Sequence, residues 1–119
     1  MSWKFLADSP VYIQIADRIR SSVLSGEYAP GGQIPTVRQL ATIAAVNPNT
    51  VQHAFSELED QGLIVSKGTM GRFVTDDEAV IQSCRKKHAE KLVKQFLVNA
   101  NRMSISKEEL ISMIKEADI

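Results

Sequence analysis

The sequence lacks the features of secreted and membrane proteins. It has a single cysteine, Cys84, which excludes an internal disulfide framework and is compatible with a reducing compartment. No segment approaches the ~20 apolar residues of a membrane-spanning helix. The first ten residues, MSWKFLADSP, contain too short an apolar run for a secretory signal. We therefore expect a soluble cytoplasmic protein with no membrane partner, of a length that suits one modest domain and a small appendage.

The sequence has no excess of either charge, because its 14 Lys and Arg residues balance its 14 Asp and Glu residues. This balance counts against a strongly basic nucleic-acid binder. Contacts to phosphate groups depend on local placement, however, and a neutral chain can still make them. Arg38, Lys67 and Arg72 all lie in or beside the segment 35–62 that is described below.

Groups that could carry catalysis are scarce. The histidines, His53 and His88, fall in different predicted elements, and no acid and base or activated nucleophile are paired. Cys84 and His88 are four residues apart on one predicted helix, but two ligands are too few for a metal site within one chain. We expect no enzyme, no cofactor and no metal.

The segment 35–62 is predicted to form two short helices joined by a tight turn. Thr36 and Gln39 have the spacing of a capping box, so the first helix should begin there. Asn47 followed by Pro48 is a second start signal, because Asn caps helices well and Pro suits the first helical position. Gly62 is placed to end the second helix. Apolar residues at helical spacing give each helix one buried side: Val37, Leu40, Ala41 and Ala44 in the first, and Val51, Phe55 and Leu58 in the second.

The other face of the second helix consists of hydrogen-bonding side chains that no core requires: Asn49, Thr50, Gln52, His53 and Ser56. Two short helices with a polar end on the second are the components of a helix-turn-helix, whose second helix enters the major groove of DNA. The alternative is a surface-exposed helical hairpin without a ligand.

The flanking residues 1–34 and 63–75 should complete a winged helix. A first helix is expected from about residue 10 to 25, capped by Asp8 and Ser9, and residues 3–6 should pack against the fold. Ile34 is a candidate for a short edge strand. The β-prone runs 63–66 and 73–75 enclose a glycine-containing loop and predict a hairpin whose tip can approach a groove closely. Residues 1–75 are therefore predicted to be a winged helix-turn-helix DNA-binding domain.

Residues 76–119 are predicted to be a helical dimerisation region, which makes the fold class α+β. One helix should run from 76 to about 100 and another should start at a capping box formed by Ser106 and Glu109. Both have apolar residues on more than one side, so a partner is expected, and a second copy is the simplest one. The predicted dimer contacts are Ile81, Leu92, Val93, Phe96, Leu97, Leu110 and Ile114.

Together these segments resemble the GntR family of bacterial transcription regulators, and the short C-terminus is similar to its YtrA subfamily. The likeness covers residues 10–75 and rests on YIQIADRIR, GEYAPGGQIPTVRQLA, VNPNTVQHAFSELEDQGLI and KGTMGRFV. It implies a homodimer that binds a roughly palindromic operator, usually as a repressor and in this subfamily often of transporter operons. It also implies the DNA contacts Thr36, Arg38, Asn47, Asn49, Thr50, Gln52, His53, Lys67, Gly68 and Thr69.

Two departures from the wider family affect these expectations. Many members have Lys or Arg near Gln52 and His53, so the bases contacted are left open. Larger subfamilies have an effector domain after the wing, whereas 44 residues are too few for an ordinary ligand pocket, and no tightly bound small molecule is expected. A winged helix that binds another protein is the alternative function.

Overall fold

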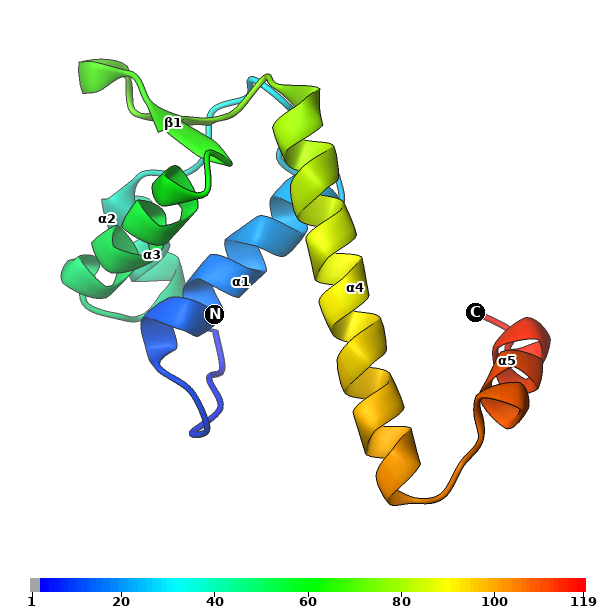
Figure 1. Cartoon of the computed structure of the whole chain (residues 1–119). Helices are drawn as coiled ribbons and strands as arrows, with labels where there is room; N and C mark the ends of the chain where they lie inside the picture. The colour runs from blue at the N-terminus through cyan, green and yellow to red at the C-terminus, as the bar shows by residue number, and fades with distance from the viewer. Residues whose placement is uncertain (1–2) are drawn as a thin grey trace. The chain divides into compact units, whose positions relative to one another are not determined.

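A computed structural model describes residues 3–119, which form five α-helices, one short 3₁₀ turn and a two-stranded sheet (Figure 1). The elements are α1 (Val11–Leu24), α2 (Val37–Ala44), α3 (Pro48–Asp60), β1 (Ile64–Ser66), η1 (Gly68–Met70), β2 (Arg72–Val74), α4 (Glu78–Arg102) and α5 (Lys107–Glu116). This order confirms the α+β class and the winged helix-turn-helix. The described chain divides into two compact units within α4, between Ser83 and Cys84. The first turns of α4 therefore belong with the winged helix, whereas we expected the boundary at residue 75.

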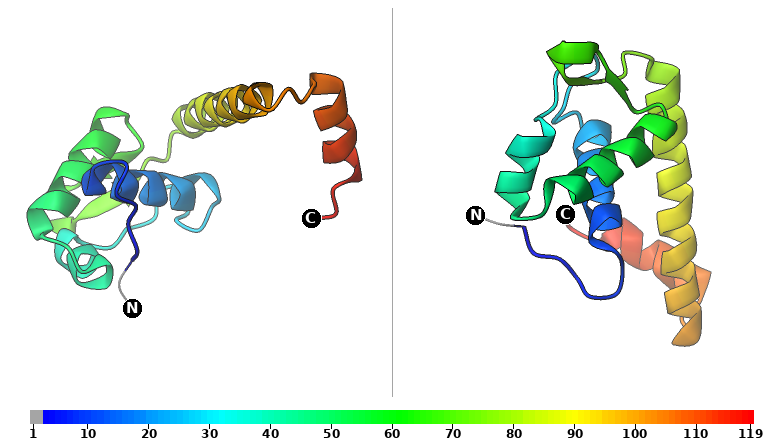
Figure 2. Two further views of the ribbon diagram at one scale, coloured as in Figure 1. Left: turned by 90° about the horizontal axis from the view of Figure 1, so that it is seen from below. Right: turned by 90° about the vertical axis from the view of Figure 1, so that its left-hand side faces the viewer.

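The core of the first unit lies where α3 packs against α1, α2 and β1 (Figures 1 and 2). The apolar stripe predicted for α3 is buried, with Ala54 added to it. The largest fully buried side chains are Phe55, Ile15, Ile19, Leu40, Leu58, Leu63, Ile64, Val51 and Val74. Burial of each such side chain contributes about 1.5–3 kcal/mol. The fold is thus held around α3, the second helix of the helix-turn-helix, which we call the recognition helix.

The predicted start signals of α2 and α3 are confirmed. Thr36 Oγ1 accepts a hydrogen bond from the backbone N–H of Gln39 at 3.1 Å, and the Gln39 side chain accepts one from the Thr36 N–H at 2.9 Å. Asn47 Oδ1 accepts a hydrogen bond from the N–H of Asn49 at 2.8 Å. Between the two helices Ala45 has a left-handed backbone, with φ 58°. The turn between the helices therefore takes only the three residues 45–47.

The predicted cap of α1 is wrong. The capping position is Pro10, which makes no side-chain hydrogen bond to the helix, and neither Asp8 nor Ser9 caps it. Instead the Gln14 amide binds the preceding segment: it accepts from the N–H of Leu6 and donates to the carbonyls of Leu6 and Ser9, all within 2.9 Å. One turn further along α1, the Arg18 guanidinium lies 4.1 Å from the centre of the Trp3 ring. Trp3 and Leu6 thus contact α1, which confirms that the segment 3–6 packs against the fold. The role of Gln14 in holding this segment was not predicted.

The wing is an antiparallel hairpin in which Ile64 pairs with Val74, Val65 with Phe73 and Ser66 with Arg72. The predicted edge strand at Ile34 is only a single bridge, between Gln33 and Phe73, although the Ile34 N–H does donate to the Arg72 carbonyl at 3.0 Å. The loop before α2 thus fastens the wing to the helices. Figure 1 shows the hairpin extending away from the helices α1 to α3.

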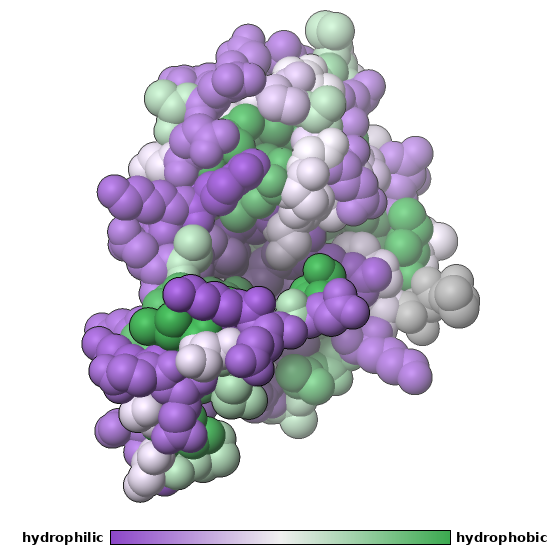
Figure 3. Space-filling model, turned by 90° about the vertical axis from the view of Figure 1, so that its right-hand side faces the viewer, coloured by the Kyte–Doolittle hydropathy of each residue, from purple (hydrophilic) through white to green (hydrophobic). Residues whose placement is uncertain are grey.

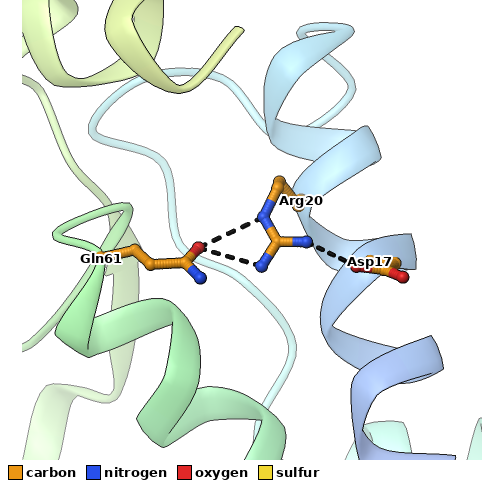
Figure 4. Close-up of polar contacts among 3 residues, drawn as sticks. All are labelled: Asp17, Arg20 and Gln61. Atoms are coloured by element: carbon orange, nitrogen blue, oxygen red, sulfur yellow. Dashed lines mark hydrogen bonds and ion pairs between the residues drawn. The ribbon is translucent and has the colours of Figure 1, made fainter. Parts of the chain in front are cut away.

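A buried arginine joins α1 to the C-terminal end of α3. Arg20 Nη1 donates to Asp17 Oδ1 at 2.6 Å, while Nε and Nη2 donate to Gln61 Oε1 at 3.2 and 2.9 Å (Figure 4). Arg20 is only 7% exposed, and the guanidinium lies between the two helices. A buried charge requires such partners. The arginine therefore fixes the distance between α1 and the end of the recognition helix.

The helices of the C-terminal region leave much of their apolar surface exposed. Leu92 is 69% exposed, Phe96 45% and Ile114 62%, and Val93 is also exposed. Ile81 and Leu110, two of the predicted dimer contacts, are only 5% and 8% exposed in a single chain, so they offer little apolar surface to a second copy. Leu97 is half-buried. The face shown in Figure 3 has separate apolar patches among hydrophilic side chains.

The predicted cap of α5 is present, because Ser106 Oγ accepts a hydrogen bond from the Glu109 N–H at 3.2 Å. The Glu109 carboxylate accepts from the Ser106 hydroxyl at 3.4 Å.

No helix among residues 3–119 is both long enough and apolar enough to cross a membrane.

Candidate nucleic-acid interface

The exposed face of α3 offers hydrogen-bonding groups at successive turns. Asn49 and Gln52 are exposed, as predicted, and Thr50 is half-buried. Ser56 extends this face by one turn, although its hydroxyl donates to the Gln52 carbonyl at 3.1 Å. Asn and Gln amides can bind an adenine through two hydrogen bonds in the major groove. Asn49 and Gln52 are thus the side chains best suited to contact bases.

Three other predicted DNA contacts, Thr36, Asn47 and His53, also make contacts within the fold. The Thr36 hydroxyl and the Asn47 side-chain oxygen are occupied by the caps of α2 and α3. The caps use only the acceptor oxygens, so the Thr36 O–H, the Asn47 amide N–H groups and the exposed Arg38 guanidinium can still donate to DNA. His53 is exposed, but its ring stacks on Tyr12 of α1 with centroids 3.5 Å apart and planes 8° apart.

The wing tip is held in place by contacts on both of its strands. Lys67, Gly68 and Thr69 are exposed, and the Lys67 ammonium lies 4.7 Å from the centre of the Phe73 ring. Gln33 Nε2 donates to the Met70 carbonyl at 2.8 Å. A Cβ atom on Gly71, whose φ is 102°, would lie only 3.0 Å from the same nitrogen. Glycine at this position therefore lets the loop before α2 support the wing tip.

Arg72 does not present a free charge to DNA. Its Nε donates to the Glu59 carboxylate at 3.2 Å, and its guanidinium carbon lies 4.9 Å from the centre of the Phe55 ring. The residue thus connects β2 to α3. It fixes the wing relative to the recognition helix, a role that sequence position alone did not show.

The first unit has a negative formal charge. Residues 1–83 contain nine acidic and six basic residues, which gives −3. Arg20 and Arg72 are paired with carboxylates, and Arg18 lies on Trp3. The basic residues of 3–83 without a carboxylate partner are Lys4, Arg18, Arg38 and Lys67, and the ring contacts of Arg18 and Lys67 leave their charges available to phosphate groups. Neutral hydrogen-bond donors must therefore supply much of any DNA contact.

Among residues 3–119 no three His, Cys, Asp or Glu side chains are grouped so that they could hold a metal ion. Sequence reasoning identified most polar positions of α3 and the wing tip. It missed Tyr12 and Gln33, because each meets its partner across a distance of more than 35 residues in the chain. No periodicity within one helix indicates which residue of another helix it contacts.

Known proteins share this arrangement. The family model of bacterial regulatory proteins, gntR family, matches residues 11–74. The HTH-type transcriptional repressor YtrA of Bacillus subtilis is 32% identical over 111 residues, which are 92% of this chain and 85% of that protein.

Two solved structures are also similar. A GntR family transcriptional regulator from Listeria monocytogenes has a TM-score of 0.88 and 32% identity, and the match covers 96% of this chain and 100% of that one. The DNA-binding domain of AraR in complex with operator ORX1 has a TM-score of 0.56 and 30% identity over 63% of this chain and 93% of that one. The chain thus belongs to the GntR family and is a DNA-binding transcription regulator.

Proposed function

We propose that this regulator is a repressor that binds a roughly palindromic operator as a homodimer. The observation that carries the proposal is the apolar surface that α4 and α5 leave exposed, at Leu92, Val93, Phe96 and Ile114. Exposed apolar residues at helical spacing mark an interaction surface, and a two-fold dimer is the commonest way to cover one. The likeness to a relative named as a repressor supports repression over activation.

A dimer also compensates for the weak electrostatic attraction of one winged helix. The first unit has a formal charge of −3, so a single copy gains little from the phosphate backbone. Two linked recognition helices bind the second half-site at a high effective concentration. The half-sites are expected about 10 bp apart, or a multiple of that spacing, so that both face one side of the duplex.

The dimer is tested with Phe96→Glu, which places a charge on the exposed apolar surface and alters no buried side chain. Sedimentation of this variant should give a monomer at micromolar concentration, with weakened operator binding. Lys94→Glu is the matched control, because it introduces the same residue two positions away on the same helix, at a polar, exposed site, and changes the net charge by even more. Sedimentation of the unaltered chain as a monomer would refute the dimer.

Repression is tested by deleting the gene and measuring transcripts of the genes beside it. We propose that these include a transporter operon, on the strength of the resemblance to the YtrA subfamily. Their transcripts should rise in the deletion strain and fall again when the unaltered gene is restored. A fall on deletion would show an activator instead.

We further propose that no small molecule binds the chain tightly at one site per subunit. The structure of residues 78–116 supports this, since they form two helices, which enclose little volume. A metabolite that raised the melting temperature and released DNA at micromolar concentration would contradict the proposal.

A further inference from the structure

The stacked pair of Tyr12 and His53 has a geometry that needs an explanation. Tyr12 lies in the first turn of α1 and His53 in the second turn of α3, and their ring planes are 8° from parallel at a centroid distance of 3.5 Å. A stack this close occupies one face of the imidazole and fixes its plane. His53 is nevertheless exposed, so the edge of its ring is open to a ligand.

The pair lies at one border of the DNA-facing surface of α3. His53 follows Asn49 by one turn, so the two share a face of the helix. Glu59, which binds Arg72 of the wing, lies six residues after His53, about 120° away around the helix axis at 100° per residue. The stack and the wing therefore flank the base-contacting residues from two sides.

The chemistry of the pair suits a phosphate group better than a base. A neutral imidazole has one N–H donor, and a tyrosine hydroxyl also supplies one. Base recognition by side chains relies mainly on two hydrogen bonds to one base edge, which Asn, Gln and Arg can make. Single donors, among them tyrosine, commonly bind phosphate oxygens.

We propose that Tyr12 and His53 together form a phosphate-binding pair, so that Tyr12 belongs to the DNA interface and His53 contacts the backbone of the duplex and not a base. Tyr12 has a second role as a positioning residue, because its ring holds the imidazole. The pair complements a winged helix that has few uncommitted basic residues. This inference rests on DNA binding by the winged helix and does not depend on the proposed dimer.

A hydroxyl donor carries no positive charge and releases no counterion when it binds phosphate, so a Tyr12 contact should have a distinctive signature. Binding should weaken equally for every DNA sequence, while the dependence of affinity on salt stays the same. A base contact would instead change the preference for operator over random DNA. A cationic phosphate contact would change the slope of log affinity against log salt by about 0.9.

The experiment measures fluorescence anisotropy of the full chain with two duplexes of equal length. One is selected by the unaltered chain from a random library, and the other has a scrambled sequence. Tyr12→Phe keeps the ring and removes the hydroxyl, and should weaken binding to both duplexes roughly tenfold, the effect of one hydrogen bond to a charged group. Tyr12→Leu also removes the stack, and should weaken binding further. His53→Ala should resemble Tyr12→Phe.

Two controls calibrate the readouts: Asn49→Ala should reduce the ratio of operator to scrambled binding, and Arg38→Ala should reduce the salt slope. If His53→Ala reduces the ratio as Asn49→Ala does, His53 contacts a base and the proposal is wrong. If Tyr12→Phe binds like the unaltered chain, and Tyr12→Leu lowers only the melting temperature, the pair is a packing contact and the proposal is also wrong. If Asn49→Ala and Arg38→Ala have no effect either, the DNA interface itself is misplaced.

Discussion

Arg20 shows how one residue can set the position of a recognition helix. Its guanidinium makes three hydrogen bonds, to Asp17 of α1 and to Gln61 at the end of α3, and it is almost fully buried. Removing one partner of a buried charged pair costs about 3–5 kcal/mol, but Asp17 is largely exposed and can be hydrated after the change. We therefore expect a cost nearer that of hydrogen bonds to a charged group.

Arg20→Ala should lower the free energy of unfolding by about 2–3 kcal/mol. Urea denaturation followed by circular dichroism measures this change. Arg38→Ala serves as the control, because Arg38 is exposed and makes no side-chain contact that the fold needs. It should leave stability nearly unchanged and weaken DNA binding. Equal denaturation midpoints for the two variants would show that the Arg20 contacts contribute little.

Tyr28 is expected to make stability fall in alkali. Burial raises the pKa of its hydroxyl above 10.0, the neighbouring Glu27 carboxylate raises it further, and Arg18 opposes both. The folded chain therefore holds this proton more tightly than the unfolded chain does. The resulting stability is present below pH 10 and is lost as pH rises through the folded pKa. In the Tyr28→Phe variant no group at this position can ionise. Its unfolding free energy should therefore fall less than that of the unaltered chain between about pH 9 and pH 11, the range on either side of the usual tyrosine pKa. Parallel pH profiles would contradict the assignment.

The sequence predicted the local structure around the candidate site residues well where short-range rules determine it. Thr36 and Asn47 were recognised from helix caps, which need only neighbours within four residues. Asn49 and Gln52 were recognised as polar residues that no core uses. Arg72 was counted as a basic residue near DNA, yet it is bound to Glu59, 13 residues earlier in the chain. Pairing of this kind depends on how the wing folds back, which is a tertiary property.

Among the elements, the turn between α2 and α3 stores backbone strain. Ala45 adopts φ 58° and ψ 49°, a left-handed conformation that costs a residue with a Cβ atom about 1–2 kcal/mol. Glycine avoids this cost but loses more entropy on folding, about 0.5–1 kcal/mol. Ala45→Gly should therefore raise the free energy of unfolding by up to about 1 kcal/mol, given these opposing terms.

Thermal or urea unfolding of Ala45→Gly is best compared with that of Ala41→Gly. Ala41 is a buried residue within α2, where glycine destabilises a helix by about 1 kcal/mol. The same substitution should thus have opposite signs four residues apart. Destabilisation at both positions would show that the left-handed turn carries no strain.

At the level of elements most of the fold was predictable, because caps, apolar periodicity and turn glycines agree with one another. The wrong predictions occur where a contact with a residue elsewhere in the chain, and not a local sequence pattern, determines the structure. The start of α1 was assigned to Asp8 and Ser9, whereas the Gln14 amide organises the preceding segment from within the helix. Ile34 was expected in a strand, but only Gln33 bridges to the wing. The burial of Ile81 was missed because α4 begins in the first compact unit.

For the whole molecule, the distribution of charge predicts a shallow salt dependence. Lys4, Arg18, Arg38 and Lys67 are the basic residues of 3–83 without a carboxylate partner. Each phosphate that is neutralised adds about 0.9 to the slope of log affinity against log salt, so the slope should not exceed about 4 per subunit. Titration of one duplex at several salt concentrations measures the slope. A value well above this limit would show that basic residues beyond position 83 also contact DNA.

The exposed face of α3 has a consequence for how such regulators diverge. Asn49 and Gln52 project from a helix whose position is set by other residues, namely the cap at Asn47, the arginine at position 20 and the buried side of α3. A gene duplicate could exchange these two side chains with little loss of stability, since exposed positions tolerate most substitutions. If Asn49 and Gln52 contact bases as predicted, operator preference can drift by single mutations while the scaffold stays constant, and copies of one gene can acquire separate targets before their folds differ.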